Sequence, residues 1–158
     1  MKNNGFTLIE LVMVLVLIGI IAVFVAPQLG SITGTNASAF KDKLRADIRY
    51  AQNLAMSQNK RYRVYFNTNP PSPASGYAVV FDTSGGGWTT FGFAQDPAGG
   101  GNLSVTLNTG NYAGITVSTP AGGFVEFNSL GAPTAAATIT ITPGGQQVTI
   151  TAQTGAVN

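Results

Sequence analysis

Glu10 is the side chain whose chemistry is most informative, because this carboxylate lies among apolar residues. An ionised carboxylate at bilayer depth costs roughly 2.5–3.5 kcal/mol on insertion scales, so it normally has a partner. No cation of the chain can reach Glu10 within its own helix. A cut after Gly5 would create an α-amine on Phe6, about one helical turn away. In a helical assembly, that amine could neutralise Glu10 of a neighbouring subunit and fix the axial register.

Catalytic groups are scarce in this sequence. The chain has no histidine and no cysteine, which excludes Ser-His and Cys-His pairs as well as disulfides. The glycine runs 85–87 and 99–101 lack the context and the lysine of a phosphate loop, so we expect them to form loops. For Asp82 and Asp96 we favour turn capping over a calcium site, which needs six to eight oxygen ligands. We predict no catalytic residue, no metal and no cofactor.

Residues 1–30 combine a short polar leader with a long apolar run. From Leu11 to Ala26 there is no polar side chain, and with residues 6–10 the run is roughly long enough to span hydrocarbon as a helix. A conventional secretory signal peptide also has a basic start and an apolar core. Against that alternative, the leader ends already at Gly5, Glu10 interrupts the run, and no small-residue cleavage site follows it.

The segment Gly5-Phe6-Thr7-Leu8-Ile9-Glu10, followed by the apolar run, resembles the class III signal of type IV prepilins and type II secretion pseudopilins. The resemblance implies that prepilin peptidase cuts between Gly5 and Phe6 and N-methylates Phe6. It also implies that Glu10 pairs with the N-terminus of a neighbour during subunit assembly.

Gly19 and Pro27 lie where this family commonly has a flexible glycine and a helix breaker. Proline removes a helical hydrogen bond and glycine weakens a helix, so we expect a kink at these residues and an interrupted or melted stretch within residues 19–35. The kink is either incidental to a plain anchor or lets the helix bend during assembly.

Residues 39–59 have the apolar periodicity of an amphipathic helix, with Ser38 as a plausible N-cap. The apolar positions recur at spacings of three and four and are Phe40, Leu44, Ile48, Ala51, Leu54 and Ala55. All eight basic residues of the chain lie at or before Arg63. We expect the basic side chains on this helix to face solvent or a neighbouring subunit, with contact to lipid headgroups or DNA as the alternatives.

After Lys60 the pattern changes to short β-type segments. We expect about seven or eight antiparallel strands, at residues 62–66, 76–82, 88–94, 103–107, 115–118, 124–127, 138–142 and 147–152. Pro143-Gly144-Gly145 is predicted to be a hairpin turn. In the third segment, Phe91 and Phe93 would share one sheet face and Trp88 the other, and we favour core packing over a ligand platform for them.

The segment Arg45–Met56, the immediate strand at Tyr62–Phe66, and the C-terminal pattern of Phe127–Gly131 and Thr154–Val157 resemble the minor pseudopilins of the GspH/FimT type. The resemblance implies an α+β, type IV pilin-like fold in which a long N-terminal helix packs on a C-terminal antiparallel β-sheet domain. We expect a leader at 1–5, a helix at 6–60 with its transmembrane or filament-core part at 6–27, and a β-rich domain at 61–158.

The resemblance implies a structural role rather than an enzymatic one. A minor pilin or pseudopilin would help to initiate or cap a type IV pilus or type II secretion pseudopilus. Its partners would be other pilin subunits, prepilin peptidase, an assembly platform protein and the inner membrane. The precursor would span that membrane once, with its N-terminus cytoplasmic, and the filament would be periplasmic or extracellular. The alternatives are a major pilin and a DNA- or surface-binding minor pilin. DNA is disfavoured because no basic residue follows Arg63.

Overall fold

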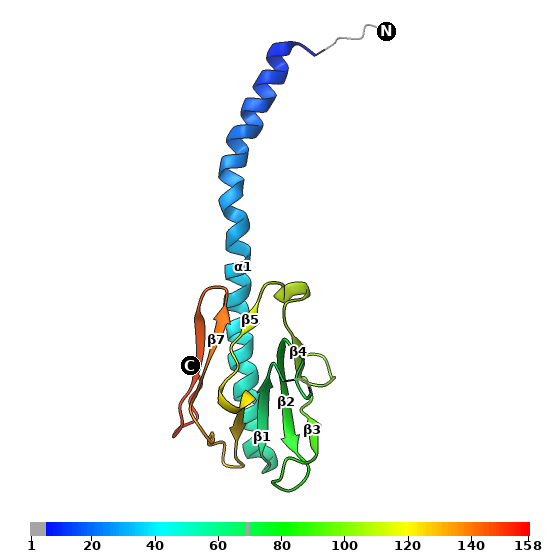
Figure 1. The fold of residues 1–158 in the computed structure, drawn as a ribbon, viewed down its shortest axis with the longest axis vertical. Helices are drawn as coiled ribbons and strands as arrows, with labels where there is room; N and C mark the ends of the chain where they lie inside the picture. The colour runs from blue at the N-terminus through cyan, green and yellow to red at the C-terminus, as the bar shows by residue number, and fades with distance from the viewer. Residues whose placement is uncertain (1–5, 69) are drawn as a thin grey trace.

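The computed structural model describes residues 6–68 and 70–158, and for residues 24–33 it describes the backbone alone. Figure 1 shows one long helix, α1 (Leu8–Gln58), whose first half projects from a β-rich domain and whose second half packs against it. The predicted α+β fold, with a long N-terminal helix on an antiparallel β domain, is confirmed. The predicted leader, residues 1–5, lies outside the described residues.

Both ends of α1 are set by local capping. Thr7 is the N-cap, and its side chain and that of Glu10 form a capping box. Asn59 ends the helix in the left-handed conformation, with φ of 52°, and its amide donates to the Ala55 carbonyl. The helix therefore has nearly the bounds expected from the sequence.

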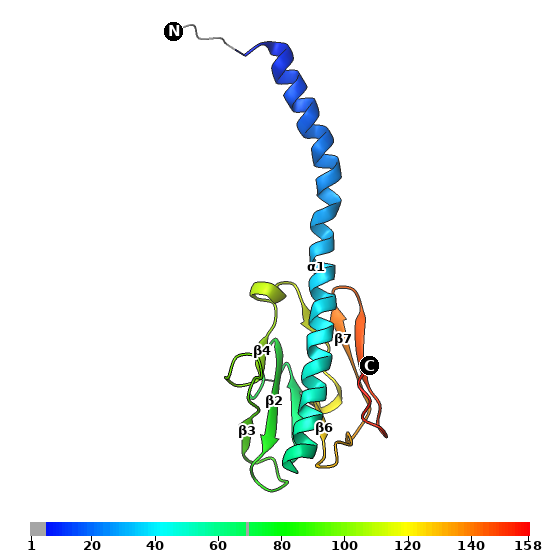
Figure 2. The same ribbon diagram turned by 180° about the vertical axis from the view of Figure 1, so that it is seen from behind.

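The expectation of an interrupted stretch within residues 19–35 was wrong, because the backbone of α1 is helical throughout. Figures 1 and 2 show a gentle curve rather than a break. Helix formation is cooperative, so intact turns on both sides can continue the helix through the weak positions Gly19 and Pro27. A role for these two residues in bending the helix stays a prediction.

Ser38 is not an N-cap, since it lies inside the continuous α1. Its hydroxyl instead accepts a hydrogen bond of 2.7 Å from the Gln146 side chain. The cap was predicted there because the apolar periodicity changes character near residue 38. The change marks the point at which α1 meets the domain, and Ala37 is the first fully buried residue among the helix side chains that the structure describes.

The β-rich domain contains two antiparallel sheets. The five-stranded sheet has the order β3-β2-β1-β6, with β4 also paired to β2, and the three-stranded sheet has the order β5-β7-β8. The strands are β1 (Tyr62–Phe66), β2 (Gly76–Asp82), β3 (Phe91–Phe93), β4 (Ser104–Thr106), β5 (Thr116–Val117), β6 (Phe124–Phe127), β7 (Ala137–Thr142) and β8 (Gln146–Ile150). Residues 143–145 join β7 to β8, as predicted for the hairpin.

The core lies between the second half of α1 and both sheets, as Figure 2 shows from the helix side. Six α1 residues at spacings of three and four are fully buried: Ala37, Phe40, Leu44, Ile48, Ala51 and Ala55. The predicted apolar face is thus confirmed, except that Leu54 is only partly buried. The strands contribute alternate side chains, such as Ile139 and Ile141 of β7. This packing fixes the domain on the second half of the helix.

Candidate assembly site

The first turn of α1 holds Glu10 in a closed set of hydrogen bonds. The Glu10 carboxylate accepts from the Thr7 amide at 3.0 Å and from the Thr7 hydroxyl at 2.8 Å. In return, the Glu10 amide donates to the Thr7 hydroxyl at 3.4 Å. The sequence reasoning missed this capping box, although Thr-x-x-Glu before an apolar run is its signature. Within the described residues, Glu10 has no basic partner.

Phe6, the residue predicted to become the mature N-terminus, lies before the helix and is 82% exposed. Gly5, on the other side of the predicted cut, is outside the described residues. The cleavage of this bond and the methylation of Phe6 therefore stay predictions. Because Phe6 precedes the N-cap, an amine created there would lie at the positive end of the helix dipole.

The projecting half of α1 is apolar on every face. All residues from Phe6 to Val23 are exposed, and apart from Thr7, Glu10 and Gly19 they are large hydrophobic residues or alanine. Burial of each Val, Leu, Ile or Met side chain would gain about 1.5–3 kcal/mol. A helix that is hydrophobic all round is one that becomes buried, in lipid or among other helices.

Among the residues whose side chains the structure describes, no helical stretch meets both the length and the hydropathy required to cross a membrane.

Where α1 meets the five-stranded sheet, a buried carboxylate joins the two. Asp47, only 6% exposed, accepts a 2.5 Å hydrogen bond from the Tyr77 hydroxyl and pairs with Lys43 at 2.9 Å. Burial, and then the charge of Asp47, raises the pKa of Tyr77 well above its ordinary value of 10.0. The sequence signal for part of this network was the Lys43–Asp47 spacing of four on a helix.

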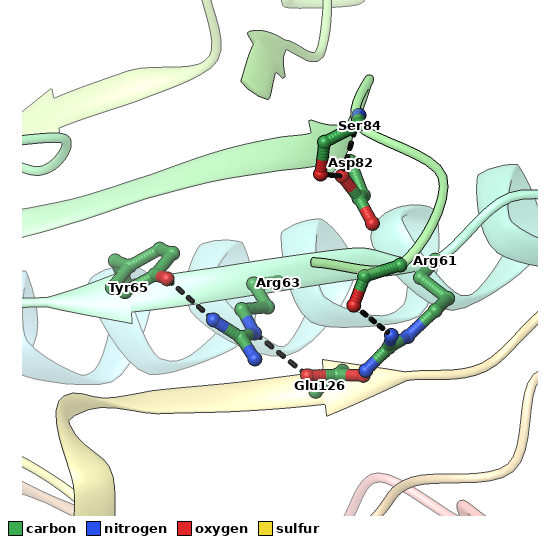
Figure 3. A network of polar contacts seen from close by, with 7 residues as sticks. Arg61, Arg63, Tyr65, Asp82, Ser84 and Glu126 are labelled. Atoms are coloured by element: carbon green, nitrogen blue, oxygen red, sulfur yellow. Dashed lines mark hydrogen bonds and ion pairs between the residues drawn. The ribbon is translucent and has the colours of Figure 1, made fainter. Parts of the chain in front are cut away.

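A second buried carboxylate, Glu126 of β6, lies between two arginines of the neighbouring strand region (Figure 3). One oxygen accepts from Arg61, and the other accepts from Arg63 at 2.7 Å. Arg61 also donates to the Gly86 carbonyl at 2.8 Å. The register that pairs Arg63 with Glu126 brings these charges together. The sequence could not show this, because strand pairing joins positions far apart in the chain.

Aromatic rings enclose the Arg63 guanidinium. Its central carbon lies 4.0 Å from the ring centroid of Trp88 and 3.9 Å from that of Phe124. Trp88 lies in the β2–β3 loop rather than in a strand, and the predicted strand 88–94 is reduced to β3. Trp88, Phe91 and Phe93 are all outside the buried core, so the prediction of core packing for them was wrong. Because β3 is at the edge of its sheet, its side chains are only partly covered.

Asp82 and Asp96 cap turns, as predicted. An oxygen of Asp82 accepts from the Ser84 amide at 2.8 Å and from the Ser84 hydroxyl at 2.5 Å, as Figure 3 shows. Asp96 accepts from the Ala98 amide at 2.8 Å. The hydrogen bond from the Ser84 hydroxyl lowers the pKa of Asp82, against the effect of burial. Among the described residues, no group of three or more His, Cys, Asp or Glu could hold a metal ion.

Two family models match the chain. The model of the type II transport protein GspH matches residues 42–155, which is most of the chain. The chain belongs to the GspH family. A second model, the prokaryotic N-terminal methylation motif, matches residues 1–26. No curated protein matches the sequence.

Crystal structures of the type IV minor pilin FimU from Pseudomonas aeruginosa resemble this GspH-family chain. One is 16% identical, with a TM-score of 0.51 over 78% of this chain and 87% of FimU. A second crystal form gives 16% identity and a TM-score of 0.46, over 77% and 90% of the two chains. At this identity, the first match shows a shared fold.

Family membership and the methylation motif make this GspH-family chain a structural subunit of the minor pilin or pseudopilin kind. Family and fold are those of structural subunits rather than enzymes, and they imply assembly with other pilin subunits. The exposed half of α1 is the feature of the structure suited to that assembly.

Proposed function

We propose that this chain is made as a single-pass precursor in the inner membrane, with its N-terminus cytoplasmic, and is then incorporated into a filament. Prepilin peptidase cuts it between Gly5 and Phe6 and methylates Phe6. An assembly platform protein transfers it into a periplasmic or extracellular filament, where it helps to initiate or cap assembly. The methylation motif at residues 1–26 supports the processing steps.

The observation that carries this proposal is the projecting half of α1. From residue 6 to residue 23 it exposes apolar side chains on every face, while the same helix is buried against the domain from Ala37 onward. The two halves of this helix are therefore suited to two different environments. Its first half leaves lipid for the core of a filament, and its second half keeps the domain outside that core.

Glu10 has a specific role in the proposal. Among the described residues of the uncut chain, its carboxylate accepts hydrogen bonds only from Thr7 and forms no ion pair with a basic side chain. After the cut, the new amine on Phe6 of a neighbour supplies the missing charge. That pairing offsets the cost of a carboxylate in an apolar filament core and sets the register between subunits.

Glu10→Ala and Glu10→Gln test this role together. Gln at the third helical position can keep the capping box but carries no charge. If charge pairing drives incorporation, both variants are cut normally but enter filaments about tenfold or more less well than wild type, which corresponds to a loss of about 1.4 kcal/mol. The measurement is the mass of the mature N-terminus together with the amount of chain in sheared filaments.

The outcomes separate the steps. A mature chain that begins with methyl-Phe6 supports the processing, whereas a start after residue 25 would indicate a conventional signal peptide. Full incorporation of Glu10→Gln would show that the charge of Glu10 is not needed.

A further inference from the structure

The end of the domain farthest from the N-terminus is built from three connections, and we call it the pole. They are the α1–β1 link, the β2–β3 loop and the turn after β6, and the first two are seen at the lower end in Figure 1. An open hollow of about 340 Å³ lies among them. It is lined by Asn59, Lys60, Arg61, Asp82, Gly85, Gly86 and Ser129.

The accessible charges of the pole are basic. Lys60 is exposed, and the Arg61 side chain is 38% exposed although Glu126 and the Gly86 carbonyl hold it in place. The two carboxylates nearby, Asp82 and Glu126, are only 7% and 3% exposed. An approaching molecule therefore meets two positive side chains at the rim of the hollow.

One buried carboxylate in the wall of the hollow is that of Asp82. Asp82 uses one carboxylate oxygen for Ser84, while its other oxygen, Oδ2, is buried without a hydrogen-bond partner among the described residues. A buried carboxylate oxygen normally accepts a hydrogen bond from a protein donor or from water. Asp82 lines the hollow, and the Gly86 backbone on the same rim is among the groups that lower the pKa of its carboxyl.

The turn that contributes Ser129 to the hollow also carries an exposed apolar side chain. Leu130 is 82% exposed, and the Asn128 side chain accepts 3.0 Å hydrogen bonds from the amides of Leu130 and Ala132. Met56 of α1 is 48% exposed, and its sulfur lies so close to Gly131 that a Cβ there would be only 2.7 Å away. The turn therefore holds a leucine in solvent, and burial of this side chain against another surface would be favourable.

We propose that the pole docks an acidic segment of the neighbouring pilin domain in the filament, with Leu130 as the apolar anchor. A carboxylate of that segment lies between Lys60 and Arg61. This inference rests on the proposed function. If the projecting halves of α1 bundle in the filament core, the domains stack along the axis, so that the pole faces the next domain rather than the membrane.

Cysteine labelling tests the docking, because the natural chain has no cysteine. Leu130→Cys is compared with Thr138→Cys, an exposed position on β7 away from the pole. In detergent-solubilised full-length chain, maleimide should label both. In sheared filaments, labelling of Leu130→Cys is expected to fall about tenfold further than that of Thr138→Cys, as for a residue in a desolvated interface centre. Equal labelling of the two positions in filaments overturns the proposal.

Charge reversal gives a second test. Lys60→Glu should lower the amount of chain in filaments by about tenfold, because it puts like charges together in the interface. Lys41→Glu, on α1 away from the pole, is the control and should incorporate like wild type, and both variants should unfold at the wild-type temperature. Normal incorporation of Lys60→Glu overturns the charge pairing. Failure of the wild-type chain to appear in filaments would instead overturn the proposed function.

Discussion

Asp47 is a charged group buried at the junction of α1 and the five-stranded sheet. The free-energy cost of burying this carboxylate depends on its partners. Its carboxylate accepts a hydrogen bond from the Tyr77 hydroxyl of β2 and forms an ion pair with the Lys43 ammonium of α1. The partners of its charge therefore come from one strand and from its own helix. A buried carboxylate with such partners is tolerated, whereas one that loses a partner destabilises the fold. This junction therefore links the pH of the solution to the packing of the helix on the domain.

Tyr77→Phe should lower the free energy of unfolding by about 1.5–3 kcal/mol at neutral pH, since it removes a hydrogen bond to a charged group. Because the pKa of Tyr77 is raised in the folded chain, the unfolded chain ionises first as pH rises above about 10. The wild type therefore loses stability above that pH, and the variant should lose less. Denaturant unfolding at pH 7 and between pH 9.5 and about 11 measures both effects. An unchanged alkaline slope in the variant would contradict the assignment.

Glu126→Gln should destabilise the domain by about 3 kcal/mol, because it removes the charge that compensates Arg61 and Arg63. The matched control is Asp42→Asn on the exposed face of α1, which should change the stability by no more than about 0.5 kcal/mol. Urea denaturation of the two variants and the wild type gives the comparison. A Glu126→Gln variant as stable as the control would show that the buried network contributes little.

At the scale of elements, α1 is the piece that the sequence predicted best and the sheets are the piece it predicted least. Residues such as Phe40 and Leu44 recur with a helical period, and that signal needs only local information. The division of eight strands into two sheets depends on which distant strands pair, as when β1 joins β6. The Glu126 network follows from that pairing, so no local pattern contained it. The Thr7–Glu10 capping box, by contrast, was visible in the sequence and was overlooked.

Leu44→Ala tests the packing of α1 on the sheets. The side chain is fully buried, so its truncation leaves a cavity and should cost about 2–5 kcal/mol. Leu130→Ala is the matched control, since the same change at an exposed position should cost no more than about 0.5 kcal/mol. Thermal unfolding of the two variants separates them. Similar losses for both would mean that the helix–sheet contact is not the main source of stability.

At the scale of the whole molecule, the continuous helix α1 joins two parts, an exposed projecting half and a folded domain. No side chain that the structure describes before Ala37 is buried, while the domain has a core of its own. The comparison with FimU shows that the fold, with a helix packed on antiparallel sheets, is shared at 16% identity. The loops that build the pole are where individual members of such a fold can differ.

Residues 34–158 should fold without the projecting helix. We expect the truncated chain to melt within a few degrees of the full chain in detergent, since the described core begins at Ala37. It should also remain monomeric without detergent, because the exposed apolar surface of residues 6–23 is gone. Calorimetry and light scattering measure the two properties. A truncated chain that is unfolded would show that the projecting half supports the domain.

The unbroken course of α1 has a mechanical consequence. The helix has 51 residues and no interruption, and its part before Ala37 projects from the domain as a lever about 44 Å long. A tilt of the domain by about 10° would move the far end of such a lever by about 8 Å, roughly one and a half helical turns. The orientation of the domain on the filament surface and the position of Glu10 in the core are therefore coupled, and neither can change far without the other.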